Sequence, residues 1–421
     1  MTTPRSVAIV GGGVIGLCCA YYLMQDGWQV TVVERGNRDH DACSLGNAGM
    51  IVPSHFVPLA APGMVSYGLK AMLSPESPFY IRPRLNADLI RWGLLFCKTA
   101  NAAHVDAAAP VLAAMNLASR ASYENLAQTL KDGNFFGLTR RGLLMLCKDK
   151  TVLEHEATLI PRAKQLGMDA QLLNPEETAK ADPAIQMDVA GSVYFPLDCH
   201  LNPSRFVQSL TAELERGGAK ILWNSPVTGF STDDGKIQCI HTTQEDVEAQ
   251  EIVIAAGSWS AETVSALGLR MPMQAGKGYS ITVDAPAQLP ELCSILTEAR
   301  VAVTPMGSTL RFAGTMEVTG LDLSINQRRV YGILKSIPQY FPAFQAQDFS
   351  SEPVWSGLRP CSPDGLPYIG RSARFSNLSI AAGHAMMGLS LAPITGRLIS
   401  QVLANQKPEI DLSLLHPDRY A

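Results

Sequence analysis

The residues with the clearest chemical meaning form a glycine-rich run, Gly-Gly-Gly-Val-Ile-Gly at residues 11–16, followed by Glu34. An apolar stretch at residues 6–10 precedes the run and predicts a buried strand, whereas residues 14–26 carry a helical pattern. Residues 29–33 predict a second strand that ends at the acid. In such a unit the turn binds a pyrophosphate and the acid binds a ribose. The sequence therefore predicts a dinucleotide site, with a plain strand–helix turn as the alternative.

Each residue of this turn has a separate expected role. Gly11 permits the tight turn out of the strand, and Gly13 lets a pyrophosphate approach the backbone. Gly16 lets the helix pack closely on the sheet. Val14 and Ile15 open the helix, whose free N–H groups and partial positive charge attract phosphate.

Two further glycine-containing segments are candidates for ligand contact. Residues 43–50 (Cys-Ser-Leu-Gly-Asn-Ala-Gly-Met) are small enough to let backbone lie against a flat ligand, although an ordinary flexible loop is the alternative. Residues 383–388 form a turn before a predicted helix at residues 390–403. A helix N-terminus in that position is a second anion-stabilising device.

Whole-chain properties narrow the class of protein. The chain has 421 residues and a formal net charge of -4, without a dense basic run, which argues against a nucleic-acid partner. Its nine cysteines form no CxxC pair and predict reduced thiols in a cytoplasmic protein without a signal peptide. No metal site is predicted. Residues 85–100 are amphipathic, and they either cover a core or lie peripherally on the inner face of the cytoplasmic membrane.

The remaining pattern alternates helices and strands. Residues 85–132 are helical with a break expected between Asn101 and Pro110, and residues 150–166 form one predicted helix. A hairpin is expected around residues 233–235, and residues 271–349 alternate in the manner of an antiparallel sheet.

Several motifs, in this order along the chain, are similar to those of the D-amino-acid oxidase superfamily of flavoproteins, and most similar to its D-amino-acid dehydrogenase branch. They are residues 11–16 with Glu34, residues 44–49, 58–63, 255–259, 277–280, 357–365 and 383–384. The resemblance implies an α/β protein with a Rossmann-like, doubly wound FAD-binding domain from residues 1–85, 200–270 and 350–421. It also implies a discontinuous α+β substrate domain, built on an antiparallel sheet, from residues 86–199 and 271–349.

The resemblance also implies which residues bind FAD. They are Gly11, Gly13, Val14, Ile15, Gly16, Glu34, Arg35, Ser44, Asn47, Ala48, Gly49, Met50, Val227, Ala256, Gly257, Trp259, Arg359, Gly383, Met387, Gly388 and Ser390. Val227 is expected to meet the adenine end through its backbone.

The implied reaction is oxidative deamination of a D-amino acid. Hydride passes from Cα to flavin N5, an imine forms and is hydrolysed to a 2-oxo acid, and the electrons pass to a quinone-type acceptor. Arg359 is expected to bind the substrate carboxylate, with a structural pairing to Asp364 or another acid as the alternative. His55 and His384 either assist the reaction or only position the substrate, and a structural role is the alternative for each, since a lone histidine is more often structural. Tyr279 either lines the substrate pocket or is a structural strand residue.

One position departs from the oxidases of this superfamily. They carry a carboxylate-binding tyrosine three residues before a proline, whereas this chain has Ala302 before Pro305. The departure favours the dehydrogenase branch, and resemblance to hydroxyproline-catabolic relatives suggests D-proline or cis-4-hydroxy-D-proline as substrate. The alternatives are an oxygen-using oxidase of glycine, sarcosine or D-amino acids, and a non-catalytic flavin-binding electron-transfer subunit. The accepted side chain, the electron acceptor and the oligomeric state stay open.

Overall fold

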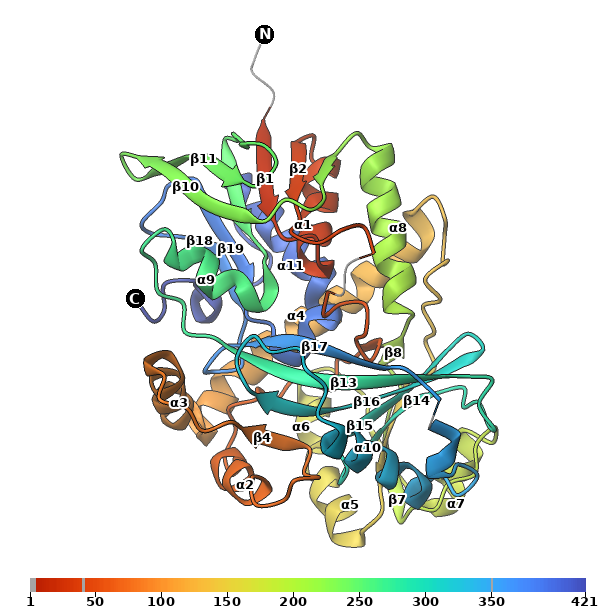
Figure 1. The fold of residues 1–421 in the computed structure, drawn as a ribbon. Helices are drawn as coiled ribbons and strands as arrows, with labels where there is room; N and C mark the ends of the chain where they lie inside the picture. The colour runs from red at the N-terminus through yellow and green to blue at the C-terminus, as the bar shows by residue number, and fades with distance from the viewer. Residues whose placement is uncertain (1–4, 40–41, 350) are drawn as a thin grey trace.

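The computed structural model describes residues 5–39, 42–349 and 351–421. Its first sheet has six strands in the order β18-β19-β12-β1-β2-β9. These are β1 (Ser6–Val10), β2 (Gln29–Val33), β9 (Lys220–Leu222), β12 (Glu251–Ile254), β18 (Tyr368–Arg371) and β19 (Leu378–Ala382). All neighbouring pairs are parallel except β18 with β19. The sheet forms the upper half of the molecule in Figure 1.

The side chains of β1 alternate between two hydrophobic clusters, one on each face of this sheet. Val7 and Ile9 point into a core that contains α1 (Val14–Gln25), α8 (Pro203–Arg216) and α11 (Gly388–Leu403). Ala8 and Val10 point to the opposite face, where a hairpin packs. The hairpin consists of β10 (Val227–Asp233) and β11 (Lys236–Thr242), which confirms the turn expected near residue 234. Successive side chains on a strand point to opposite faces, so both faces of the apolar strand are buried.

The second sheet is largely antiparallel and lies below the first in Figure 1. Its strands run in the order β17-β13-β16-β15-β14-β5-β7-β6, and β4 pairs with β16. They are β4 (Phe79–Ile81), β5 (Leu143–Cys147), β6 (Gln171–Leu173), β7 (Gly191–Phe195), β13 (Gln274–Asp284), β14 (Cys293–Leu296), β15 (Val301–Met306), β16 (Thr309–Val318) and β17 (Val354–Cys361). Two of these strands, β4 and β17, belong to segments that were expected in the FAD-binding domain. They lie in the second sheet instead, because β4 pairs with β16 and β17 pairs with β13.

Most helices lie where the pattern predicts them, and one expectation was wrong in detail. The break expected between Asn101 and Pro110 lies at the start of that range, at residues 100–101, between α3 (Ala87–Thr99) and α4 (Ala102–Thr129). Asn101 caps α4, and the helix continues through the proline. The single helix expected over residues 150–166 is two, α5 (Lys150–Ala157) and α6 (Ile160–Gln165). The other helices are α2 (Met64–Ala71), α7 (Pro175–Ala181), α9 (Ser260–Ser265) and α10 (Gln327–Tyr340).

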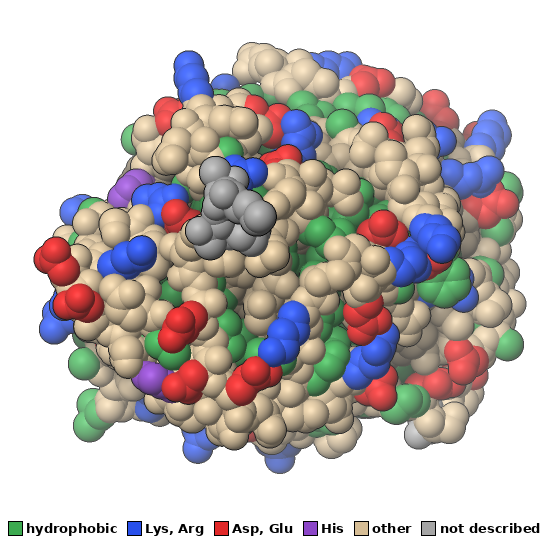
Figure 2. Space-filling model, turned by 90° about the horizontal axis from the view of Figure 1, so that it is seen from above, with side chains coloured by type: hydrophobic (Ala, Val, Ile, Leu, Met, Phe, Trp, Pro, Cys, Tyr) green, Lys and Arg blue, Asp and Glu red, His purple; other side chains and the backbone are tan. Residues whose placement is uncertain are grey.

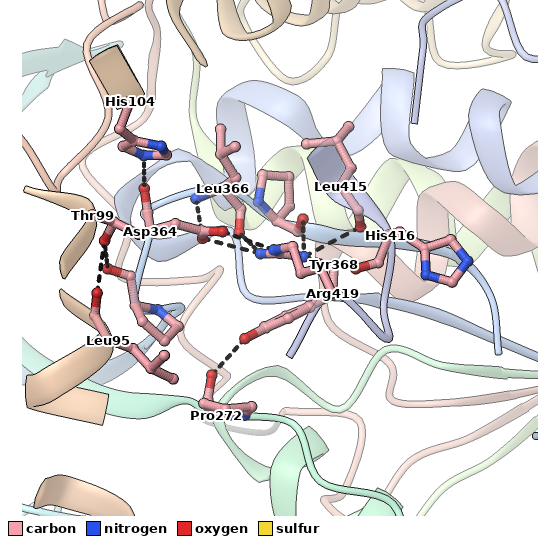
Figure 3. Close-up of polar contacts among 12 residues, drawn as sticks. Leu95, Thr99, His104, Pro272, Asp364, Leu366, Tyr368, Leu415, His416 and Arg419 are labelled. Atoms are coloured by element: carbon pink, nitrogen blue, oxygen red, sulfur yellow. Dashed lines mark hydrogen bonds and ion pairs between the residues drawn. The ribbon is translucent and has the colours of Figure 1, made fainter. Parts of the chain in front are cut away.

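The C-terminal segment is fastened to the turn between β17 and β18 by Arg419 (Figure 3). Its Nε and Nη2 donate to Oδ2 and Oδ1 of Asp364 at 2.7 and 3.0 Å, and Nη2 also donates to the Leu366 carbonyl. The guanidinium lies 3.9 Å from the ring centroid of Tyr368, whose hydroxyl donates to the carbonyl of Pro272. Burial alone would raise the pKa of Asp364, but the bonds and charge of Arg419 hold it below its ordinary value.

We expect Arg419→Met to destabilise the protein by about 3–5 kcal/mol, because it leaves a buried carboxylate without its partner. The measurement is urea unfolding, with Lys220→Met as control; the Lys220–Glu245 pair is exposed, and its loss should cost about 1 kcal/mol or less. Arg419 holds the pKa of Asp364 below its ordinary value in wild type, whereas burial without Arg419 would raise it. The stability difference between wild type and Arg419→Met should therefore be full at neutral pH and shrink on acidification, as Asp364 of the variant binds a proton first. A difference independent of pH would contradict this account.

Candidate cofactor and substrate site

A cavity of about 450 Å³ lies at the carboxyl ends of β1, β2 and β12, where open α/β sheets bind ligands. It extends from the start of β10, past the N-terminus of α1, to β17 and the N-terminus of α11. Fifteen of the predicted site residues line it: Gly11, Gly13, Val14, Ile15, Glu34, Arg35, Ser44, Asn47, Val227, Ala256, Gly257, Trp259, Arg359, His384 and Gly388. The structure therefore brings together residues from both ends of the chain.

Other predicted residues lie behind the cavity wall rather than on it. They are Gly16, Ala48, Gly49, Met50, Gly383, Met387 and Ser390, together with His55 and Tyr279. Gly49 has φ +79°, and a Cβ there would meet the Leu201 carbonyl oxygen at 2.4 Å. Ser390 accepts a hydrogen bond from the Val52 N–H and donates one to Asn116. These contacts show that Gly49 and Ser390 pack against the segments around the cavity. Direct contact of either residue with a ligand remains a prediction.

The turn before α1 is shaped by close backbone packing. Gly11 has φ +115°, and a Cβ at Gly16 would lie 1.9 Å from the Gly11 carbonyl oxygen. Gly13 is the N-cap of α1; it has no side chain to cap the helix, and it lines the cavity. The Val14 N–H donates to Ser44 Oγ at 3.0 Å, which joins the helix start to the loop at residues 43–50. This N-terminus presents partial positive charge to the cavity.

Glu34 is buried and held by two backbone N–H groups. Gly12 donates to Oε2 at 2.6 Å and Gly36 donates to Oε1 at 2.8 Å. Each carboxylate oxygen has a second acceptor position, so the group can still accept from ribose hydroxyls. Nearby, the Arg35 guanidinium lies 3.4 Å from the ring centroid of Trp259, and both residues line this end of the cavity.

The loop at residues 43–50 is held by a residue that the sequence analysis missed, Arg311 on β16. Its Nη1 donates to the carbonyls of Leu45 and Asn47 at 3.1 and 2.8 Å, and its Nε donates to Thr282 Oγ1. Burial lowers the pKa of Arg311 to about 10, which leaves it charged at neutral pH. No local signal marks this arginine, since the two loop carbonyls that it binds are more than 260 residues away in sequence.

Arg359 is the cation at the far end of the cavity from Glu34. Its Nη1 donates to the Thr315 carbonyl at 2.6 Å, and a Cβ at Gly278 would lie 2.2 Å from the same nitrogen. Gly278 therefore makes room for the guanidinium on this face of β13. The alternative pairing of Arg359 with Asp364 is wrong, because that carboxylate is bound by Arg419.

Tyr279 lies on the opposite face of β13 from the Arg359 guanidinium. Its hydroxyl donates to Glu317 Oε2 at 2.9 Å and accepts from the Asn326 N–H at 3.1 Å. Glu317 is buried and also contacts Lys277 and Arg329. Of the two expected roles of Tyr279, these contacts fit the structural one: it belongs to a buried polar cluster on the face of β13 away from the Arg359 guanidinium, because side chains alternate along a strand.

The two candidate histidines differ in their surroundings. His384 lines the cavity, and its Nε2 contacts Thr395 Oγ1 at 2.9 Å, while that hydroxyl donates to the Leu391 carbonyl. Nε2 of His384 must therefore carry the proton, and burial lowers its pKa to about 3. Its ring is neutral and held by α11. His55 does not line the cavity; its Nδ1 contacts Ser54 Oγ at 3.0 Å.

This arrangement fits a flavin dinucleotide. The N-termini of both α1 and α11, whose N-cap residues Gly13 and Met387 make no side-chain cap, meet one cavity that has an acid at one end and Arg359 at the other. Gly13, Glu34 and Val227 would hold the nucleotide part, whereas Arg359, His384 and Gly388 surround the opposite end.

On the face turned to the viewer in Figure 2, basic and acidic side chains are interspersed.

Comparisons with known proteins agree with the predicted fold. The family model of the DAO family, described as FAD dependent oxidoreductase, matches residues 6–402. A D-amino acid dehydrogenase of Bradyrhizobium diazoefficiens is 31% identical over 425 residues, covering 99% of both chains, and one of Helicobacter pylori is 30% identical over 407 residues, covering 96% of both. Glycine oxidase from Geobacillus kaustophilus shares the fold, with a TM-score of 0.79 and 24% identity over 99% of this chain and 100% of that chain. The predicted α/β fold, with one parallel and one largely antiparallel sheet, is confirmed.

Proposed function

Because the chain belongs to the DAO family of FAD-dependent oxidoreductases, we propose that it is a D-amino acid dehydrogenase. The observation that carries the proposal is the position of Arg359, a cation on the wall of the FAD cavity beside the N-terminus of α11. The full-length similarity to two chains named D-amino acid dehydrogenase supports the same activity.

The proposed reaction divides its tasks between the cofactor and the chain. Gly13, Glu34 and Val227 would hold FAD, which would supply the acceptor for a hydride from the substrate Cα. The Arg359 guanidinium binds the substrate carboxylate, because its planar fork matches two carboxylate oxygens. The uncapped N-terminus of α11 stabilises negative charge at the same end of the cavity. His384, neutral and fixed by Thr395, adds no charge there.

We further propose a cyclic substrate, D-proline or cis-4-hydroxy-D-proline, and a quinone-type electron acceptor. The substrate proposal is supported by the resemblance to hydroxyproline-catabolic relatives. It is also compatible with Ala302, which on β15 packs against an apolar cluster containing Met50, Val52 and Phe56. A small residue there offers no phenol to a carboxylate, which leaves that task to Arg359.

The direct test is anaerobic mixing of the purified holoenzyme with D- and L-amino acids, including both cyclic imino acids, while the oxidised-flavin absorbance is followed. Bleaching by D-isomers, slow recolouring in air and rapid recolouring by a quinone analogue would support the proposal. Rapid recolouring with peroxide release would identify an oxidase instead. Bleaching by L-isomers alone, or by no amino acid, would reject it, and the latter would favour a non-catalytic flavin subunit.

A surface around α2 and α3 supports access to a membrane-borne quinone. Both helices lie at the lower left of the molecule in Figure 1. The surface is defined by six apolar residues that are between 36% and 104% exposed: Val65, Leu69, Leu73, Leu85, Ile90 and Leu94. Lys70, Arg82 and Lys98 are exposed in the same segments, together with Asp88 and with Glu76, which is paired with Lys335. Apolar side chains bordered by cations suit the surface of an anionic bilayer. Among the described residues, no helix is long and apolar enough to cross a membrane.

We therefore expect the holoenzyme to sediment with vesicles containing phosphatidylglycerol. The triple variant Leu69→Ser, Leu73→Ser, Leu94→Ser should bind them about tenfold or more weakly, because each buried leucine contributes about 1.5–3 kcal/mol at most. Reduction of a soluble dye should be unchanged, since these residues do not line the cavity. Leu172→Ser, at an exposed leucine on β6, is the control. Equal vesicle binding by the triple variant and the control would refute this surface.

A further inference from the structure

Three side chains that can bind a metal ion lie together on the outer face of the hairpin formed by β10 and β11. The thiol sulfur of Cys239, one ring nitrogen of His241 and one carboxylate oxygen of Asp246 all lie within 4.8 Å of one another. The hairpin is at the upper left of the molecule in Figure 1. None of these three residues lines the FAD cavity, so the proposed reaction does not use them.

The backbone register places the three side chains on one face. Cys239 and His241 are two residues apart on β11, and side chains two apart on a strand share a face. Ile240, between them, points inward and is buried in the core. Ile240 and Val247 exchange two backbone hydrogen bonds of 2.9 Å, so Asp246 stands opposite His241. The cluster therefore follows from the pairing of β11 with the chain that returns after it.

The turn that carries Asp246 is held in place by Thr242. The Thr242 hydroxyl accepts from the N–H groups of Gln244 and Glu245 at 3.1 Å each, and it donates to the Glu245 carbonyl at 2.6 Å. The Glu245 carboxylate pairs with Lys220 on β9 at 2.8 Å. Because protein contacts already order this backbone, less conformational entropy is lost when the side chains bind an ion.

Ser231 on β10 orients the imidazole of His241. Ser231 pairs with Cys239 across the hairpin, and its Oγ lies 2.7 Å from His241 Nε2, whereas His241 Nδ1 lies 3.0 Å from Asp246 Oδ2. A hydroxyl can donate or accept. Ser231 can therefore donate to Nε2 while Asp246 accepts from Nδ1–H, and it can accept from Nε2–H when Nδ1 binds a metal. A hydrogen-bond partner on the second ring nitrogen is the usual support of a metal-bound histidine.

The donor set is that of a zinc site. A thiolate, an imidazole and a carboxylate all bind Zn²⁺, and three protein ligands leave the fourth tetrahedral position to water, whereas Mg²⁺ and Ca²⁺ prefer oxygen ligands alone. Ligand atoms that lie about 2.0–2.3 Å from zinc are about 3.3–3.8 Å apart in a tetrahedron. The side chains of His241 and Asp246 are 36% and 60% exposed, so an ion from solution can reach them.

We propose that Cys239, His241 and Asp246 bind a Zn²⁺ ion, with Ser231 as a positioning residue. On binding, the Cys239 S–H bond breaks and its proton passes to water. The thiolate, His241 Nδ1 and one Asp246 oxygen then bond to the ion, which ties β11 to the turn at residues 242–246. Spacing alone does not bring Asp246 to the other two residues, which is why the sequence analysis predicted no metal site. The proposal is independent of the proposed function.

The first test is Co²⁺ titration of the untagged, full-length holoenzyme after treatment with a chelator. Co²⁺ substitutes for Zn²⁺ and reports its ligands by absorbance. We expect tetrahedral cobalt, seen as d–d absorbance at longer wavelengths than the flavin, together with a thiolate-to-cobalt charge-transfer band in the near ultraviolet. Added Zn²⁺ should abolish both signals.

Variants assign the signals to the cluster. Cys239→Ser should lose the charge-transfer band and bind Zn²⁺ about 10²-fold or more weakly, since loss of a ligand costs at least as much as loss of an outer partner. The affinity is measured by competition with a chromophoric chelator. Cys97→Ser, at an exposed cysteine on α3, is the control and should match wild type. Asp246→Asn should weaken binding while the charge-transfer band stays.

Ser231 has its own test. Ser231→Ala should bind Zn²⁺ about tenfold more weakly with the cobalt spectrum retained, because the ligands remain but the imidazole loses its partner. Ser231→Thr keeps the hydroxyl and should restore the affinity. Equal affinities in Ser231→Ala and wild type would remove Ser231 from the site.

Amide hydrogen exchange locates the ion without reference to activity. Zn²⁺ should slow exchange at residues 239–247 in wild type but not in Cys239→Ser. The same cobalt spectrum in wild type and Cys239→Ser, the absence of a thiolate band in wild type, or unchanged exchange in this segment would overturn the proposal. FAD content and metal-free urea unfolding establish that each variant is folded, and Asp246→Asn changes only an exposed side chain.

Discussion

Arg359→Ala is expected to lower kcat/KM for the D-amino acid by about 30- to 5,000-fold, because loss of one partner of a desolvated charge pair costs about 2–5 kcal/mol. The reason is the surroundings of this guanidinium: its Nη1 donates to the Thr315 carbonyl, and among the described residues no carboxylate is bonded to it. Its charge is therefore free for the substrate carboxylate. The measurement is single-turnover flavin reduction, with FAD content determined from absorbance in each variant.

Two matched variants separate charge from geometry at this position. Arg359→Lys keeps the charge but cannot donate two parallel hydrogen bonds, so its activity should stay closer to Arg359→Ala than to wild type. Gly278→Ala keeps Arg359 but brings a Cβ to 2.2 Å from Nη1, which forces the guanidinium aside. A similar loss in Gly278→Ala, with FAD retained, would show that the position of the guanidinium matters. Full activity in Arg359→Ala would exclude the carboxylate role.

The parts of the site that could be predicted are those encoded by local order. The turn at residues 11–16 and the acid at Glu34 belong to one strand–helix–strand unit, whose geometry follows from the chain itself. The N-terminus of α11 was found in the same way, because a glycine-containing turn precedes an apolar helix. Local patterns also predicted the two kinds of sheet.

Features that depend on distant pairing could not be predicted. Arg311 holds a loop that lies more than 260 residues earlier, and nothing near it in sequence indicates that partner. The pairing of Asp364 with Arg419 depends on where the C-terminal segment returns. Tyr279 shows a second reason why a prediction can fail. The alternation of side chains along a strand indicates that Tyr279 and Gly278 lie on opposite faces of β13, but only the packing of the sheet determines which of these faces borders the cavity.

The turn before α1 combines two requirements, backbone packing and ligand access, and two glycine variants should separate them. In Gly16→Ala the new Cβ would lie 1.9 Å from the Gly11 carbonyl oxygen, so β1 and α1 must move apart. We expect a loss of about 1–3 kcal/mol in the stability of the FAD-free protein, as for other overpacked sites, together with a loss of FAD binding.

Gly13→Ala should weaken FAD binding without the loss of stability. Gly13 has φ -73° and ψ 174°, which alanine adopts freely, and its Cβ would meet only Ser44 Oγ at 3.5 Å, an ordinary contact. The added methyl would occupy cavity space where a pyrophosphate must approach the backbone. Urea unfolding of the FAD-free proteins and FAD titration measure the two effects. Equal stability losses in both variants would mean that Gly13 serves the fold rather than the ligand, whereas unimpaired FAD binding by Gly13→Ala would place the pyrophosphate elsewhere.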